Sequence, residues 1–285
     1  MKTLFSVLAT STILLLASCS KEKSIDSTDP DGGGSGGGNQ ASGQLVKTVI
    51  QLGTTDSTVS YFAYDGQGRF TRQWLGGTQN IMSDNGETRV VRNGQGTIQY
   101  IVIKDQVGAS DSLLYTVNFN AGTGRYTSKI ITEEVSGTVY RDSIVYSYNS
   151  SGQITEELYY TKVNNQPYEE WSKILFTYNN GNLTEYRGFY MDDLTNAYVQ
   201  ESRIVIEYDN KQSPLVLGAE GIVMDQINYV SPNNVTSAVV SDLSDPANDE
   251  TVSYEYVYND KNKPATASIT FSSLGLPIPV TFYYN

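Results

Sequence analysis

The sequence predicts an all-β protein, an antiparallel meander of about 14 strands that closes, or nearly closes, into a soluble barrel. Three observations predict it: short runs of alternating polar and apolar residues, Asn, Asp and Gly between these runs, and a return of the whole pattern about every 29 residues. Alternation with a period of two places one face of each strand in a core. Asn, Asp and Gly tolerate the positive φ that tight hairpin turns require.

Each repeat has an aromatic anchor that precedes a turn, as in Tyr64-Asp65-Gly66-Gln67-Gly68. The anchors lie at positions 64, 92, 119, 148, 178, 208 and 258, so that successive steps are 28, 27, 29, 30, 30 and 50 residues. One repeat supplies two antiparallel strands and two turns, and seven repeats therefore supply about 14 strands. The long last step predicts an insertion near residues 212–250 within a β-repeat domain that spans residues 45–285.

The two faces of the predicted strands differ in polarity. Ile144, Tyr146 and Tyr148 share one face, which is apolar and aromatic, whereas Ser147 lies on the other. We expect the aromatic face to be packed and the polar face to meet water. Arg92 replaces the anchor aromatic of the second repeat, and this departure leaves the pairing of its hairpin open.

Residues 1–18 resemble the signal peptide of bacterial lipoproteins. A positive start at Lys2 and an apolar stretch are followed by Leu16-Ala17-Ser18-Cys19, which is similar to a lipobox. The resemblance implies cleavage before Cys19, acylation of its thiol and new amine, and attachment to a membrane through these lipids. The alternative is a plain secretory signal that ends in a chance cysteine. Residues 19–44 then form a flexible tether rich in Gly and Ser.

The segment after Cys19 bears on location. Ser20-Lys21-Glu22-Lys23 resembles the signal that sends some lipoproteins to the outer face of the outer membrane, although Lys23 interrupts it. The resemblance implies an outer-membrane, lipid-anchored protein with surface exposure. We expect no insertion of the barrel itself, because a lipid anchor makes an integral barrel redundant and because charges occupy mid-strand positions, namely Lys129, Glu157, Lys173 and Glu207.

Composition excludes several functions. The 285 residues contain no His and one Cys, so that a Ser-His-Asp triad, a Cys-His dyad, an imidazole metal site and an internal disulfide are all absent. The net charge of −12 argues against nucleic acid as a partner, since such proteins need a basic face. We expect no cofactor and no metal site.

Two sets of motifs resemble known families. The Tyr-x-Tyr-Asp/Asn-x-x-Gly pattern is similar to the tyrosine/aspartate repeats of large bacterial secreted and toxin-shell proteins. The C-terminal third resembles a family of bacterial lipoproteins of unknown function with a porin-like β-barrel fold. The residues that carry this second resemblance are Asn210–Pro214, Ser231–Thr236, Tyr254–Asn259 and Lys263-Pro264. It implies a closed or nearly closed barrel over about residues 45–285 and implies no known activity.

Two tryptophans are candidate ligand-binding residues, since aromatic rings with a polar edge suit a half-wet surface. Trp171 lies outside the anchor pattern, beside two glutamates, and is the better candidate of the two; Trp74 is the other. The alternative for either is cross-strand packing.

Four Asp-Ser pairs, each followed by Thr or an apolar residue, resemble the acceptor motif of an O-glycosylation system of some Gram-negative lipoproteins. This resemblance implies modification at Ser27, Ser57, Ser112 and Ser143. The alternative is that Asp and Ser end turns before strands.

We therefore expect a non-catalytic binding or scaffold module in the cell envelope, with a sugar or another envelope component as its ligand. One alternative is a glycoside hydrolase, because paired carboxylates can hydrolyse glycosides without His. Pairs such as Glu156-Glu157 cannot converge as neighbours in one strand, so a hydrolase would need carboxylates from different strands. The other alternative is a purely structural envelope protein.

Overall fold

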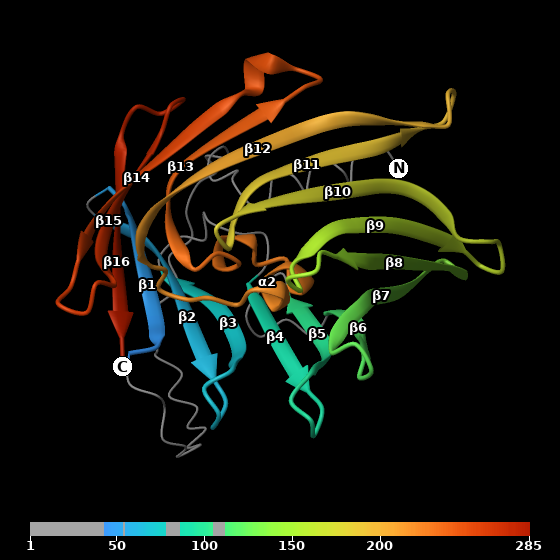
Figure 1. Ribbon diagram of the computed structural model, residues 1–285, viewed down its shortest axis with the longest axis horizontal. Coiled ribbons are helices and arrows are strands. Elements are labelled where there is room, and N and C mark those ends of the chain that lie inside the picture. The colour runs from blue at the N-terminus through green and yellow to red at the C-terminus, as the bar shows by residue number, and fades with distance from the viewer. Residues whose placement is uncertain (1–42, 54, 78–85, 105–111) are drawn as a thin grey trace.

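The computed structural model describes residues 43–53, 55–77, 86–104 and 112–285, and these form a closed antiparallel barrel of sixteen strands (Figure 1). Each strand pairs with its neighbours in the chain, and the first pairs with the last. The strands are β1 Leu45–Leu52, β2 Asp56–Tyr64, β3 Phe70–Gly77, β4 Glu87–Arg92, β5 Ile98–Lys104, β6 Leu113–Asn120, β7 Arg125–Val135, β8 Thr138–Tyr148, β9 Ile154–Val163, β10 Glu169–Asn179, β11 Asn182–Asp192, β12 Ala197–Gln212, β13 Asn233–Asp242, β14 Glu250–Tyr258, β15 Pro264–Phe271 and β16 Pro277–Tyr284.

Helix is scarce in the described residues. It comprises α2 (Ala219–Val223) and two 3₁₀ turns, η1 (Ile227–Tyr229) and η2 (Pro246–Asn248). Within the same residues, no helix has the length and apolar character that crossing a bilayer requires.

The prediction of an all-β closed antiparallel barrel is confirmed, but the predicted number of about 14 strands is wrong. The two additional strands, β1 and β16, belong to an eighth hairpin that is divided between the two ends of the described chain. Asn285 follows the aromatic Tyr284 and accepts hydrogen bonds at its side-chain oxygen from the amides of Gly43 (3.1 Å) and Gln44 (2.9 Å). The hairpin after Tyr64 has the same arrangement, with Asp65 accepting from two amides of its own turn.

The anchor residue of a hairpin also bonds to the preceding hairpin. The Tyr148 hydroxyl donates to the carbonyl of Tyr126 at 2.8 Å, and the Tyr208 hydroxyl donates to the carbonyl of Leu183 at 2.6 Å. Tyr64 and Tyr284 make the corresponding bonds to Leu45 and Pro264. The repeated motif therefore closes its own turn with Asp or Asn and binds its neighbour with Tyr.

The faces of the strands follow the predicted alternation. Ile144 and Tyr146 are buried, whereas Val145 and Ser147 between them are exposed. Two groups of buried apolar residues lie on the inner face, the larger around most of the ring and the smaller on β1 and β14 to β16. The outer face carries charged side chains near mid-strand, among them Lys173, Arg187 and Arg203.

The hairpin that carries Arg92 pairs regularly. β4 and β5 match over six residue pairs, with the register shift before Arg92 that other hairpins show before their anchor. The Arg92 guanidinium donates to the carbonyl of Phe70 at 3.2 Å, as the tyrosines of other hairpins do for their neighbours. Arginine thus replaces the anchor without loss of pairing.

The predicted insertion near 212–250 is shorter in the structure. Residues 233–242 form β13, which pairs with both β12 and β14 and belongs to the barrel wall. Only residues 213–232 depart from the hairpin pattern, and they enter and leave through a single turn. Asp209 before them accepts from the amides of Lys211 (2.9 Å) and Asn234 (3.2 Å), so that the turn geometry is kept around the inserted residues.

Candidate functional site

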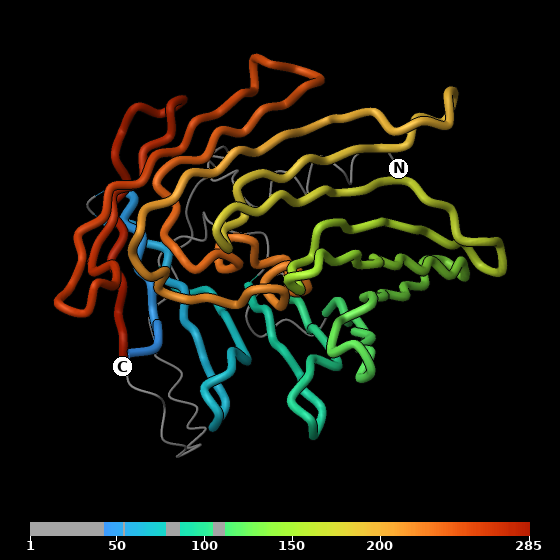
Figure 2. Tube along the Cα trace, in the orientation of Figure 1, coloured from blue at the N-terminus to red at the C-terminus, as the bar shows by residue number. Residues whose placement is uncertain are grey.

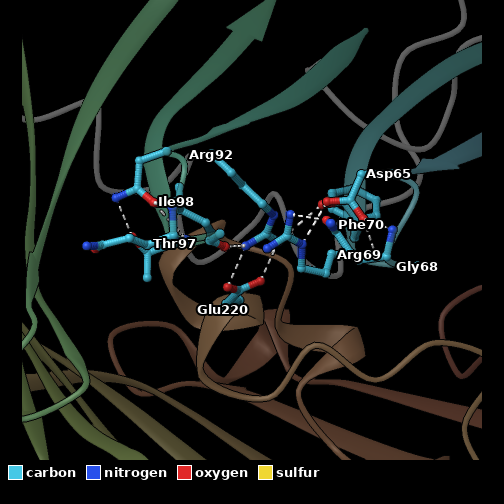
Figure 3. Close-up of polar contacts among 12 residues, drawn as sticks. Asp65, Gly68, Arg69, Phe70, Arg92, Thr97, Ile98 and Glu220 are labelled. Carbon is cyan, nitrogen blue, oxygen red and sulfur yellow. Dashed lines mark hydrogen bonds and ion pairs between the residues drawn. The ribbon is translucent and has the colours of Figure 1, made fainter. Parts of the chain in front are cut away.

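The inserted residues 213–232, which we call the plug, pack against the inner face of the barrel wall. Its apolar side chains belong to the main core, and the Tyr229 ring meets the Phe62 ring of β2 edge-on at 5.9 Å. Five apolar side chains of the plug are 0–8% exposed: Leu215, Ile222, Val223, Met224 and Val230. Figure 3 shows Glu220 of α2, part of the plug, beside Arg92 of β4.

The first polar attachment of the plug is at Arg92 (Figure 3). Its guanidinium donates to both carboxylate oxygens of Glu220, at 2.8 and 2.6 Å, and to the carbonyl of Gly96 at 3.0 Å. The Tyr126 hydroxyl donates to the same carboxylate at 2.7 Å. Burial opposes the charge of Arg92, but the hydrogen bonds and charge of Glu220 outweigh it and raise the pKa of Arg92. The ion pair therefore joins β4, β7 and α2.

The second attachment is at Lys129 of β7, whose side chain is 1% exposed. Its ammonium group donates to both carboxylate oxygens of Asp225, at 2.7 and 2.6 Å, and to the carbonyl of Val223 at 3.3 Å. A buried ammonium is stable only when it is paired and hydrogen-bonded. The plug supplies these partners, so Lys129 and the plug depend on each other.

Glu157 of β9 lies beside this pair and is 3% exposed. One of its oxygens accepts from the Tyr159 hydroxyl at 2.9 Å, and the other has no hydrogen-bond partner among the described residues. Burial raises the pKa of Glu157 to about 7; the charge of Lys129 opposes the rise and that of Asp225 adds to it. The Tyr146 hydroxyl, opposite Glu157 in the register, is also buried without a partner there.

The two candidate tryptophans lie on opposite faces of the wall. Trp171 is partly buried against the main core, and its ring meets that of Tyr159 at 5.7 Å. Trp74 lies on the outer face, because it pairs with Tyr61, the neighbour of the inward Phe62. The Tyr61 and Trp74 rings stack at 5.3 Å with an interplanar angle of 15°.

Trp74 belongs to a row of residues that face each other directly across six neighbouring strands. In register order from β16 to β5, this outer row consists of Tyr283, Lys47, Tyr61, Trp74, Glu87 and Lys104. At a strand spacing of about 4.8 Å it is about 24 Å long. The Lys47 ammonium lies 4.2 Å from the centre of the Tyr283 ring, and the Arg72 guanidinium lies 4.7 Å from the centre of the Trp74 ring.

Three of the four candidate glycosylation sites are described. Ser112 is exposed just before β6, Ser57 is half-buried in β2, and Ser143 is half-buried within β8. The turn interpretation requires Asp142-Ser143 to precede a strand, but both residues lie within β8. Ser27 and the proposed lipidation site, Cys19, lie outside the described residues.

No sequence pattern identifies the residues that hold the plug. Arg92 departs from the repeat and Lys129 is a mid-strand charge, but their partners Glu220 and Asp225 are 128 and 96 residues away in the chain. The sequence feature that indicates such a site is a charged residue at a position that the repeat assigns to the inner face. Within the described residues, no cluster of three or more acidic or Cys side chains is placed to hold a metal ion.

Comparison with solved structures gives porin-like β-barrel proteins. The chain is similar to one from Bacteroides uniformis, with 13% identity and a TM-score of 0.50 over 86% of this chain and 100% of the other. Another, from Bacteroides vulgatus, has 14% identity and a TM-score of 0.49 over 85% of this chain and 98% of the other. No family model and no curated protein matches the chain. At this identity the comparison shows the barrel fold alone.

Replacement of Arg92 tests its dual role. Arg92→Tyr gives the hairpin the usual anchor but leaves Glu220 without its cation, and we expect the free energy of unfolding to fall by about 2 kcal/mol. The double variant Arg92→Tyr/Glu220→Gln should recover most of this loss, since no carboxylate is then left unpaired. Urea unfolding of the three proteins measures both effects. A single variant as stable as the wild type would show that the ion pair does not hold the plug.

Glu157 predicts a pH dependence of stability. Its folded-state pKa is above the ordinary value of 4.5, so the folded protein holds this proton more tightly than the unfolded chain does. The stabilisation is fully present below about pH 4.5 and is lost as the pH rises through about 7. Glu157→Gln removes this contribution, about 3 kcal/mol between these limits, and the variant should lose less stability than the wild type between pH 5 and pH 8.

Glu156→Gln is the matched control. Glu156 precedes Glu157 in β9 but lies on the outer face, where its carboxylate accepts a hydrogen bond from the Ser147 hydroxyl at 3.0 Å. Denaturant unfolding at the two pH values gives the comparison. Equal losses in the wild type and in Glu157→Gln would contradict the assignment of the pH dependence to Glu157.

Proposed function

We propose that the protein is a lipid-anchored component of the outer membrane, exposed at its surface, whose barrel is a non-catalytic binding or scaffold module. The lipobox-like segment that ends in Cys19 supports the anchor. The polarity of the wall supports a barrel in water: its apolar face is turned inward, whereas the outer face carries charges near mid-strand. A membrane-spanning barrel has the opposite arrangement, with an apolar outer band.

The observation that carries the binding function is the outer row with Trp74 at its centre. Aromatic rings with polar edges, interleaved with cationic side chains, provide stacking and hydrogen bonds to a ligand that lies along the wall. Tyr283 is 42% exposed, and Tyr61 and Trp74 are half-buried, so each presents part of its ring to solvent. A sugar or another component of the cell envelope is the ligand class we propose.

The hydrolase alternative would need an accessible pair of carboxylates. The inner face offers Glu157 near Asp225, a buried acid with a raised pKa beside a second carboxylate. However, Glu157 is 3% exposed, and the Asp225 carboxylate, although 46% exposed, is paired with Lys129, so the two acids are not open to a sugar together. The same burial favours a structural role for this inner cluster.

The anchor predicts a defined mass. In a Gram-negative host, the wild-type chain should be recovered in the membrane fraction as residues 19–285 plus lipid, and Cys19→Ala should be recovered without it. Intact-mass spectrometry measures both, and further mass on the protein from its native host would indicate glycans at the candidate serines. Recovery of wild-type protein as an unmodified soluble chain would refute the anchor.

The outer row predicts the effect of Trp74→Ala. We expect it to weaken binding to purified envelope polysaccharide by about tenfold, since a lost aromatic stack is worth about 1.5 kcal/mol. Phe189→Ala is the matched control, because Phe189 is a half-buried aromatic on the far outer wall, 5.3 Å from Lys173. Affinity electrophoresis of the Cys19→Ala protein compares them. Equal retardation of both variants would remove the row from the binding function.

A further inference from the structure

Two regions of the outer wall of the barrel differ in chemistry. On β16 and β1 to β6, the outward positions hold four cations, Lys47, Arg72, Arg89 and Lys104, and one carboxylate, Glu87, among the described residues. Apolar and aromatic side chains occupy many of the other outward positions there, namely Val49, Val59, Tyr61, Trp74, Val91, Tyr100, Val102, Leu114 and Tyr283. We call this region the basic wall.

The opposite region, on β7 to β12, is a mixture of both charges. Its outward carboxylates include Glu156, Glu185 and Glu207, and its cations include Lys173 and Arg203. Opposite charges meet here, as in the ion pair between Arg203 and Glu185 at 2.5 Å. Figure 2 shows β1 to β5, in blue to teal, and β10 to β12, in yellow to orange, on opposite sides of the ring. A protein with a net charge of −12 thus concentrates unbalanced cations on one side.

Two arginines of the basic wall are arranged unfavourably for the isolated protein. Arg72 and Arg89 lie directly opposite each other on β3 and β4, where like charges destabilise the pairing. Glu87 pairs with Arg72 at 2.9 Å, whereas Arg89 is exposed and has no ion pair among the described residues. An anionic partner against this wall would relieve the repulsion.

We propose that the basic wall lies against the anionic lipid headgroups of the membrane that holds the anchor. This inference rests on the proposed function, and it identifies anionic lipid as the envelope component that the wall contacts. Half-buried Tyr and Trp beside Lys and Arg form the composition that favours a membrane interface, with rings at headgroup level and cations at the phosphates.

The position of the tether supports a membrane as occupant. Gly43, the first described residue, leads into β1, and Lys47 of β1 belongs to the outer row. Residues 20–42 separate Cys19 from Gly43, and a Gly- and Ser-rich coil of this length, as the sequence predicts, has a reach of about 25–30 Å. The anchor therefore brings the basic wall within contact of the headgroups.

The attraction between the basic wall and anionic lipid is strong enough to orient the barrel but too weak to anchor it. Each cation near an anionic surface favours contact by about fivefold, and screening beyond about 8 Å reduces the repulsion from acids on the far wall. A few such contributions cannot hold a protein from solution, but they are enough to select one orientation of a barrel that is already tethered.

Cys19 is the only cysteine, so it allows a direct test. Residues 19–285 carrying Trp171→Phe, with Trp74 as the only indole, are coupled through Cys19 to a maleimide lipid in vesicles with brominated chains. We expect Trp74 fluorescence to be quenched about twofold more in vesicles that contain phosphatidylglycerol than in pure phosphatidylcholine, and high salt to remove the difference.

Charge-reversal variants identify the wall. Lys47→Glu/Arg89→Glu should reduce the quenching to its value in phosphatidylcholine, whereas Lys173→Glu/Arg203→Glu, on the far wall, should leave it unchanged; urea unfolding confirms that both are folded. Equal quenching in the two lipids, or none in either, would overturn the proposal. In that case, weaker polysaccharide binding by Trp74→Ala would still support the binding function, with a sugar as its ligand.

Discussion

The width of a sixteen-stranded ring is the constraint on which the rest of the structure depends. Eight strands close around a space that their own side chains fill, whereas sixteen leave an open interior. The apolar faces of these strands point inward, so most of them need additional apolar side chains to pack against. The plug meets this need, and its backbone and charges require partners in turn. Arg92 and Lys129 supply them, so two cations on the inner wall are a consequence of barrel width.

This chain shares a barrel fold with porin-like proteins, but its apolar strand faces point inward. The porin-like neighbour from Bacteroides uniformis shares the barrel fold with this chain at 13% identity. A fold does not imply a function, since function resides in the surfaces that a fold presents. Here the plug packs on the inner surface, where Glu157 is buried. The proposed function therefore rests on the outer surface, with its divided charge.

The sequence predicts local features well and long-range ones poorly. The period-two alternation around Tyr146 and the turn residues after Tyr64 express short-range physics, and they predicted the strands, their faces and the hairpins correctly. The strand count was wrong because the eighth repeat is divided between Tyr284-Asn285 and Gly43–Leu45, and neither half resembles a complete unit. The plug contacts were missed because no local pattern specifies which of 31 acidic residues meets Arg92.

The division of the eighth hairpin also determines which wall can face a membrane. In a ring of similar hairpins all sides are alike, and the two ends of the chain could in principle meet within any hairpin. In this protein the break lies between β16 and β1, so Gly43 lies at one edge of the basic wall, just before Lys47. The insertion lies in a different hairpin, between β12 and β13, and extends inward to β4 and β7. The break and the insertion therefore lie on different surfaces: the break lies beside the outer row, whereas the insertion contacts the inner face of the wall and leaves that row unaltered.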